Sequence, residues 1–312
     1  MKISISRNRL LLGLGSILII AFLLSKVNIK ELFSTLGSLK WEYGLLAALL
    51  YLVGYLVRIL RLIIVLGRRS LWKWFQFTGI FQLLNRTLPF RSGEVFFPIL
   101  LKKMFAISYA ETVPQLLIIR ILDLLTLFLA FIGTLLWLEV GDFLQLTIIA
   151  LLSIGTLALL YRYRNQLIDF LFALAIRFFP KFDQQLTDIQ EKINQALSIS
   201  TFQLLSLVFL SILDKIVNFS CLVIVVFGLG FTIPLAELLA AIGLSGFSEI
   251  LPINSIGSFG TLELGWVGAL TYFGIDLDIA IKSGFASHLV VFGITLLIGT
   301  ICSITYLYSE RN

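Results

Sequence analysis

Six apolar stretches of the chain have about the length of a membrane-spanning helix, and they constrain the fold more than any other feature. A spanning helix needs about 20 consecutive, predominantly apolar residues. The stretches cover residues 10–25, 43–66, 112–138, 144–161, 202–228 and 283–308. Of the 312 residues, 59% are hydrophobic and 13% are charged, which leaves too few polar groups to cover a soluble domain. The sequence therefore predicts an all-α integral membrane protein with six transmembrane helices, and it argues against a soluble enzyme, a secreted domain or a disordered chain.

Two further apolar stretches, residues 74–104 and 233–273, are interrupted near their centres by proline and glycine. The interrupting residues are Pro89, Gly93, Pro252, Gly257 and Gly260. Each half is too short to cross a membrane alone, and Pro and Gly stop a helix. Such a break is tolerated at membrane depth only where protein or a water-filled cavity surrounds it. We therefore predict two re-entrant helical hairpins.

The order of these segments predicts an inverted 3+3 repeat. Residues 1–140 hold two spans, a hairpin and a third span, and residues 141–312 follow the same order. An odd number of spans per half inverts the second half, and paired broken helices of this kind are typical of transporters. Residues 1–312 then form a single membrane domain. Within it, the amphipathic residues 162–200 are predicted to be a cytoplasmic interfacial connector, with a partner-docking helix as the alternative.

The basic residues indicate membrane topology. If the N-terminus is cytoplasmic, fourteen of the 24 Lys and Arg residues fall in cytoplasmic segments and four fall outside. This asymmetry follows the positive-inside rule. The net charge of +6 therefore requires no nucleic-acid partner, and we expect both termini in the cytoplasm.

Residues that usually carry enzyme or metal chemistry are scarce. The two cysteines, Cys221 and Cys302, lie in apolar stretches, and His288 is the single histidine. These numbers argue against a disulfide framework, a metal centre and a Ser-His-Asp triad. The sequence also contains no nucleotide-binding loop and no nucleophile elbow. We therefore expect no cofactor and no metal, assign no catalytic residue, and interpret His288 as an ordinary interface residue at the start of the last span.

Ionisable side chains inside the apolar stretches are the candidates for function, because a charge at the bilayer centre costs at least about 2.5–3.5 kcal/mol. Half-helices that meet at a break expose unpaired N–H groups, which favour an anionic head group. Arg91 can grip a phosphate there, and Glu94 can pair with it or receive a cationic group. An ion pair that only stabilises the hairpin is the alternative. The predicted substrate-binding residues are Asn85, Arg91, Glu94, Arg120, Asp123, Asp214, Asn254 and Glu263.

The remaining charged residues have simpler interpretations. Arg58 and Arg61 lie near the cytoplasmic end of the second span, where long side chains contact lipid phosphates at the interface. Arg120 and Asp123 have the spacing of an intrahelical pair, so a structural pair and a site role both stay open. We also expect Asp214 or Glu263 to face Arg91 or Arg120 across the two-fold axis of the repeat.

Several motifs occur in order along the chain. They are Tyr55-x-x-Arg58-x-x-Arg61, Asn85-x-x-Leu88-Pro89-x-Arg91-x-Gly93-Glu94, Arg120-x-x-Asp123, and Leu251-Pro252 followed by Gly257, Gly260 and Glu263. Together they resemble the lysylphosphatidylglycerol synthase transmembrane, or flippase-like, family, which includes the membrane half of the multiple peptide resistance factor. The resemblance extends over nearly the whole chain. The turn of the second break, Asn254-Ser255-Ile256-Gly257, holds fewer glycines than the family would lead us to expect.

This resemblance implies a protein of the bacterial or archaeal plasma (inner) membrane. Its expected function is to flip a polar-headed lipid, either anionic or carrying an amino acid or sugar, from one leaflet to the other. Full synthases also carry a soluble aminoacyl-transferase domain. Because this chain stops after the sixth span, lysyl transfer is not expected, and a transporter is favoured over an enzyme.

Two alternatives stay open. One is an intramembrane transferase that acts on polyprenyl-phosphate-linked sugars, with Glu94 or Asp123 as general base. The other is a non-catalytic scaffold of a lipid-synthesis complex. The expected partners are therefore a membrane lipid and, for the scaffold, lipid-biosynthesis enzymes. The sequence leaves the oligomeric state open.

Overall fold

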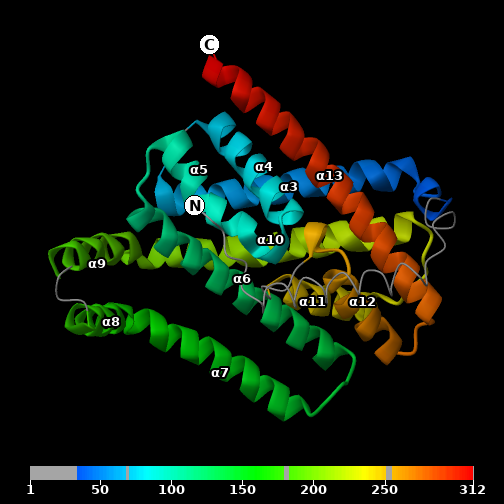
Figure 1. Ribbon diagram of the computed structural model, residues 1–312. Coiled ribbons are helices and arrows are strands. Elements are labelled where there is room, and N and C mark those ends of the chain that lie inside the picture. Colours follow the sequence, from blue (N-terminus) through cyan, green and yellow to red (C-terminus); the bar gives the residue numbers. More distant parts are fainter. Residues whose placement is uncertain (1–33, 68–69, 179–182, 251–254, 312) are drawn as a thin grey trace.

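The computed structural model describes residues 34–67, 70–178, 183–250 and 255–311 (Figure 1). All regular secondary structure in these ranges is helical, as the sequence predicts. The helices are α3 (Trp41–Leu66), α4 (Leu71–Thr87), α5 (Phe96–Phe105), α6 (Tyr109–Trp137), α7 (Phe143–Arg162), α8 (Arg164–Phe178), α9 (Asp183–Leu197), α10 (Thr201–Gly228), α11 (Leu235–Ile250), α12 (Thr261–Tyr272) and α13 (Leu277–Arg311). Two short 3₁₀ helices, η1 (Pro89–Val95) and η3 (Ile256–Ser258), lie between α4 and α5 and between α11 and α12.

Within the described residues, five helices are long and apolar enough to cross a membrane: α3, α6, α7, α10 and α13. They coincide with five of the six predicted spans, and the chain is a multi-pass membrane protein. The remaining predicted span, residues 10–25, lies outside the described residues. The last span begins at Leu277, ahead of the predicted position 283, because the Asp276 carboxylate accepts hydrogen bonds from the backbone N–H groups of Asp278 and Ile279.

Both interrupted stretches form a helix, a break and a second helix. α4 ends at Thr87, Leu88 is extended, and Pro89 starts η1. Gly93 lets η1 fold back onto α4, because a Cβ atom there would lie 2.3 Å from Cα of Asn85. In the second break Gly257 and Gly260 adopt positive φ angles of 68° and 85°, which favour glycine. Pro252 and Asn254 lie outside the described residues.

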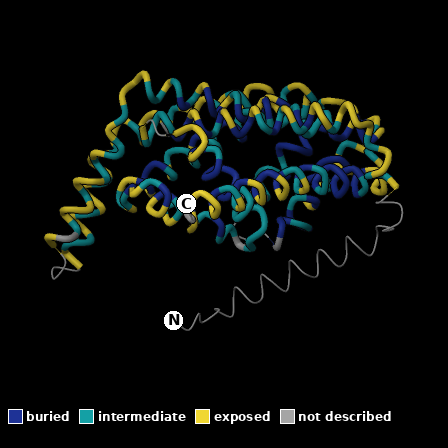
Figure 2. Tube along the Cα trace, turned by 90° about the horizontal axis from the view of Figure 1, so that it is seen from above, coloured by how far each residue is buried: buried dark blue, intermediate teal, exposed yellow. Residues whose placement is uncertain are grey.

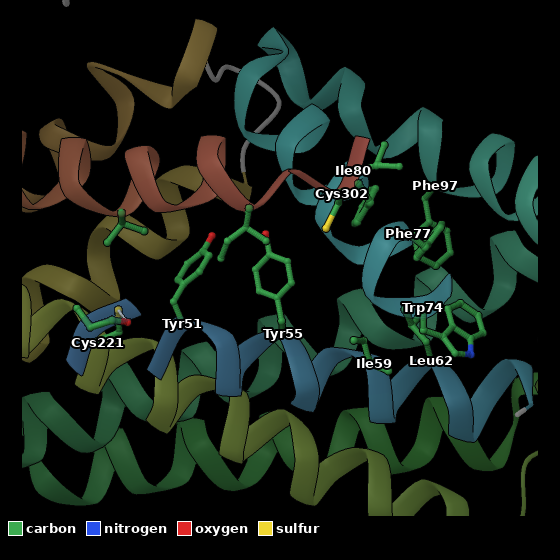
Figure 3. Close-up of a cluster of buried hydrophobic side chains, with 14 of the residues drawn as sticks. Tyr51, Tyr55, Ile59, Leu62, Trp74, Phe77, Ile80, Phe97, Cys221 and Cys302 are labelled. Atoms are coloured by element: carbon green, nitrogen blue, oxygen red, sulfur yellow. Dashed lines mark hydrogen bonds between the residues drawn. The ribbon is translucent and has the colours of Figure 1, made fainter. Parts of the chain in front are cut away.

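Helices from the first part of the chain pack against helices from the second part. α3 lies along α10, α4 packs against α13, and α11 packs against α6. Figure 3 shows the apolar core where α3, α4 and α13 meet, with Tyr55, Trp74, Phe77 and Cys302 among its buried side chains. Cys302 and Cys221 are both buried, and both are free thiols that form no disulfide. This core holds the broken helix α4 against the last span.

Helices α8 and α9 differ from the rest of the molecule. They form an arm to one side of the helical body, and none of their described residues is buried (Figure 2). The arm is tied at its base, where Tyr161 Oη donates to the carbonyl of Ile199 at 3.1 Å. The segment predicted as an interfacial connector, residues 162–200, is thus built from two helices, and α7 runs into α8 after only one residue, Tyr163.

Candidate functional site

A cavity of about 420 Å³ lies in the helical body, and residues of α3, α4, α6, α10, α11, α12 and α13 line it. Its volume falls within the range of about 300–1,000 Å³ that small-molecule sites occupy. Both breaks reach it, through Arg91 of η1 and Ser258 of η3, and η1 packs against η3. The two interruptions that are far apart in the sequence therefore meet at one site.

Charged side chains dominate the polar part of the lining. Among the described residues the cavity is lined by five cations and three carboxylates: Arg58, Arg86, Arg91, Arg120 and Lys215, and Asp123, Asp214 and Glu263. The lining thus carries an excess of two positive charges. Leucine, isoleucine and aromatic side chains such as Leu124 and Trp266 fill the remaining wall. A cavity of this kind favours an anionic group that is attached to an apolar body.

A chain of ion pairs runs from η1 through α6 to α3. Glu94 lies 3.4 Å from Arg91 and 3.0 Å from Arg120, although Glu94 itself is not part of the cavity lining. Arg120 continues the chain to Asp123 at 3.5 Å, and Asp123 contacts Arg61 at 2.6 Å. The predicted intrahelical pair of Arg120 and Asp123 is therefore present, but each partner makes a shorter contact with another element.

Arg58 and Arg61, which the sequence predicts as phosphate or interface contacts, both contact carboxylates of neighbouring helices in the structure. The Arg61 side chain is only 3% exposed and also donates to the carbonyl of Ile119. Arg58 lines the cavity, and its guanidinium donates to Asp214 at 3.1 Å and to Asn218 at 2.9 Å. Both arginines point toward carboxylate and amide acceptors on the neighbouring helices. Moving a guanidinium group out of water costs less free energy when it is paired than when it is unpaired.

The carboxylates Asp214 and Glu263 have other partners than predicted. Asp214 pairs with Arg58 at 3.1 Å, since α3 lies along α10. Glu263 pairs with His288, with 2.7 Å between Oε1 and Nδ1. The other oxygen of Glu263 accepts the backbone N–H of Gly260 at 2.6 Å and so closes the first turn of α12.

His288 is not an ordinary interface residue. Its side chain is only 6% exposed, lines the cavity and stacks on Phe259 with 4.3 Å between the ring centroids. The sequence contains a signal that could have indicated this position. Glu263 and His288 are both ionisable and both lie in apolar helices, where such groups pair with one another. Asn218 was missed as well, although it lies four residues after Asp214 and so shares its helical face.

The backbone is unusual where each break touches the cavity. Arg91 and Ser258 both adopt left-handed conformations, with φ angles of 52° and 60°. Residues other than glycine rarely adopt such angles, and those that do cluster at functional sites. Asn85, beside the first break, also lines the cavity, and its Oδ1 is buried without a hydrogen-bond partner among the described residues.

The structure thus brings Asn85, Arg91, Arg120, Asp123, Asp214 and Glu263 to one cavity, with Glu94 directly behind it. Asn254, the remaining predicted site residue, lies outside the described residues. Within the part of the chain that the structure describes, no group of three His, Cys, Asp or Glu residues is arranged to hold a metal ion. The arrangement can bind an anion through several guanidinium groups while carboxylates behind them hold those groups in place.

The chain matches a family model described as the lysylphosphatidylglycerol synthase TM region over residues 8–299. No curated protein and no solved structure matches the chain. The matched range contains all residues that line the cavity, from Tyr51 to Val291. With a match over nearly its whole length, the chain belongs to the lysylphosphatidylglycerol synthase transmembrane-region family.

Proposed function

We propose that the protein translocates an anionic, polar-headed lipid across the plasma membrane. Membership in the lysylphosphatidylglycerol synthase transmembrane-region family associates the chain with membrane lipids. The observation that carries the proposal is the cavity between the two breaks, with its excess of two positive charges. A lipid phosphate is an anion that a multi-pass membrane protein meets at high concentration. The head group would enter the cavity while the acyl chains stay in the bilayer.

Arg91 and Arg120 are the proposed phosphate contacts. Both line the cavity, and a planar guanidinium can donate two parallel hydrogen bonds to one phosphate. Glu94 contacts both arginines and Asp123 contacts Arg120, so the two carboxylates would orient the guanidinium groups. Asn85, Asp214 and Glu263 would complete the polar surface of the cavity.

The proposed mechanism uses an inverted repeat in which α4–η1–α5 and α11–η3–α12 are re-entrant hairpins. The packing pattern supports this pairing of elements. α3 pairs with α10, and the hairpin of each half packs against the last span of the other half, α4 against α13 and α11 against α6. Two halves related by a two-fold axis produce such reciprocal contacts. Alternating access would then be a rocking movement of one half against the other around the shared cavity.

Lipid movement in proteoliposomes tests the proposal. Phosphatidylglycerol with a fluorescent acyl chain is reconstituted with the protein, and a membrane-impermeant quencher reports its exchange between leaflets. We expect Arg91→Ala and Arg120→Ala to lower the rate at least about tenfold, because each variant removes a charge-assisted hydrogen bond. Lys192→Ala, on the exposed face of α9, is the matched control and keeps the wild-type rate. Wild-type rates in both arginine variants, with an unchanged elution volume, would overturn the proposal.

The same proteoliposomes also test the two alternative functions, an intramembrane transferase and a scaffold. An intramembrane transferase would change the lipid covalently, which mass spectrometry of the recovered lipid detects. Glu94 and Asp123 each contact two arginines, so neither carboxylate is free to take up a proton without losing ion pairs. A scaffold would tolerate both arginine substitutions and would leave lipid exchange at the level of protein-free vesicles.

A further inference from the structure

Lys215 is a cation at the middle of the span α10, and its side chain lines the cavity. A charge at this depth is costly, and the charged groups that spans retain there face a partner or a polar pathway. Lysine side chains near the end of a span reach the interface, but half of the hydrocarbon core is about 15 Å thick, which exceeds the length of the side chain. The cavity therefore supplies the polar surroundings of the Lys215 ammonium group.

Lys215 is partly exposed, and it makes no hydrogen bond and no ion pair with any other residue that the structure describes. Asp214, its neighbour in the sequence, pairs with Arg58 at 3.1 Å. Asp123 interacts with the charge of Lys215 at longer range, but its closest contact is Arg61, at 2.6 Å. The carboxylates of the cavity thus contact other partners, and the ammonium group of Lys215 is available to an anion that enters.

The proposed phosphate contacts Arg91 and Arg120 approach the cavity from η1 and α6, whereas Lys215 approaches it from α10. An anion held by all three side chains needs terminal oxygens for two guanidinium groups and for an ammonium group. A phosphodiester has two terminal oxygens, because the other two are bonded to carbon. A phosphomonoester has three, and all of them are strong acceptors. Only the phosphomonoester can therefore give each of the three cations an oxygen of its own.

The charge of the lining favours the same group. Five cations and three carboxylates leave an excess of two positive charges, and Glu94 and Arg61, which contact lining residues from behind, cancel each other. A phosphodiester carries one negative charge, whereas a phosphomonoester carries about 1.5 to 2 at pH 7. A positive charge that stays uncompensated among apolar side chains costs free energy. The phosphomonoester therefore neutralises the lining more completely.

We infer that Lys215 is a third anion contact of the cavity, and that the anion which all three cations hold is a phosphomonoester at the head of a lipid. This deepens the proposed function, on which the choice of a lipid as carrier rests. Arg91 and Arg120 bind two of the phosphate oxygens, and Lys215 binds the third from the second half of the chain.

Two lipids that differ by one methyl group test the inference. Phosphatidic acid is a phosphomonoester, and phosphatidylmethanol with the same acyl chains is the corresponding phosphodiester. Native mass spectrometry of the detergent-purified protein, at about pH 8 where the monoester carries nearly two charges, measures the binding of each lipid. We expect the wild type to bind phosphatidic acid at least about tenfold more tightly, because the additional ammonium contact is a charge-assisted hydrogen bond.

Substitutions of Lys215 separate a charge that binds an anion from one that only supports the fold. Lys215→Met keeps a long side chain without the charge, and we expect its preference for phosphatidic acid to fall below about twofold. Its midpoint of thermal unfolding should stay at or above that of the wild type, since an apolar side chain replaces an unpaired charge in a span. Lys215→Arg keeps the charge and should retain most of the preference. Lys192→Met, on the exposed face of α9, is the matched control and should change neither quantity.

Loss of the preference in Lys215→Met at an unchanged or higher midpoint supports the inference, even where proteoliposomes show no lipid exchange, in which case only translocation fails. Equal binding of the two lipids by the wild type, a preference that survives in Lys215→Met, or a lower midpoint in this variant overturns it. Inorganic phosphate tests the carrier. If it raises the midpoint of the wild type as much as phosphatidic acid does, the site takes a soluble phosphate, and the assignment to a lipid is overturned.

Discussion

Arg61 of α3 donates to Asp123 of α6 across 2.6 Å, and the guanidinium is almost completely enclosed by the protein. Its Nε has no hydrogen-bond partner among the described residues. The guanidinium therefore depends on Nη2, which donates to Asp123 and to the carbonyl of Ile119. Asp123 in turn contacts Arg120 at the cavity. The buried arginine is thus coupled through one carboxylate to a proposed phosphate contact.

Asp123→Ala is expected to destabilise the protein strongly. It leaves the guanidinium of Arg61 buried without its carboxylate, and the loss of one partner from a buried pair costs about 3–5 kcal/mol. The midpoint of thermal unfolding in detergent measures the effect. Asp278→Ala is the control, because it removes a carboxylate that is 59% exposed and contacts Lys282, and such surface pairs contribute about 0–1 kcal/mol. A double variant, Asp123→Ala with Arg61→Met, should recover much of the loss, and equal midpoints for Asp123→Ala and the wild type would contradict the prediction.

Gly93→Ala is expected to separate η1 from α4. The new methyl group would lie 2.3 Å from Cα of Asn85 and 2.6 Å from its backbone nitrogen, which cannot move aside as a side chain can. Forcing such a contact costs about 1–3 kcal/mol, and it displaces Arg91 from the cavity. Stability in detergent and the lipid-exchange rate should both fall. Gly133→Ala in α6, where a Cβ meets nothing within 4 Å, is the matched control and should be neutral or slightly stabilising.

Glu94→Gln is expected to tighten lipid binding and to slow lipid movement. Glu94 contacts Arg91 and Arg120. Glutamine keeps an oxygen that can orient both guanidinium groups, but it removes the negative charge that competes with a phosphate for them. Removing this charge should raise the affinity for phosphatidylglycerol about fivefold, equivalent to about 1 kcal/mol, and release should slow in proportion. Native mass spectrometry and the exchange assay report the two quantities. Glu111→Gln, at the exposed start of α6, should change neither, and weaker binding by Glu94→Gln would show that the carboxylate does not compete with phosphate.

The membrane orientation can be tested with single cysteines. Cys221 and Cys302 are 2% and 0% exposed, so the wild-type chain should stay unlabelled by a membrane-impermeant maleimide. Ser38→Cys, just before α3, is expected to react from outside the cell, and Gln184→Cys, in α9, only after the membrane is opened. Labelling of both positions from the same side would exclude the proposed orientation.

The positions of the spans could be predicted because the length and apolar character of a spanning helix are local properties. The predicted span 202–228 differs from α10 by one residue at its start, where Ser200 and Gln203 form a capping box. The breaks could be predicted for a similar reason, since Pro89 ends α4 through its own covalent geometry. Neither prediction required any knowledge of which helices are neighbours.

The partners of the charged residues could not be predicted in the same way. Asp214 or Glu263 was expected opposite Arg91 or Arg120. Asp214 contacts Arg58 instead, because α10 packs along α3. His288 was interpreted as an interface residue and pairs with Glu263, which lies 25 positions earlier on a different helix. Which side chains meet depends on the pairing and rotation of helices, and these properties arise from the packing of the whole chain.

The packing of α4 against α13 also sets an order of assembly. The broken helix α4 leaves the ribosome early, but its packing partner α13 follows all the other described helices in the chain. Until then the face of α4 that includes Gly79 and Leu83, which meets Cys302 and Gly299 of α13, lacks its partner, and the cavity wall formed by Ser287 and His288 does not exist. A truncated chain without α13 would therefore expose this face in the bilayer and become a target for membrane quality control before the cavity has formed.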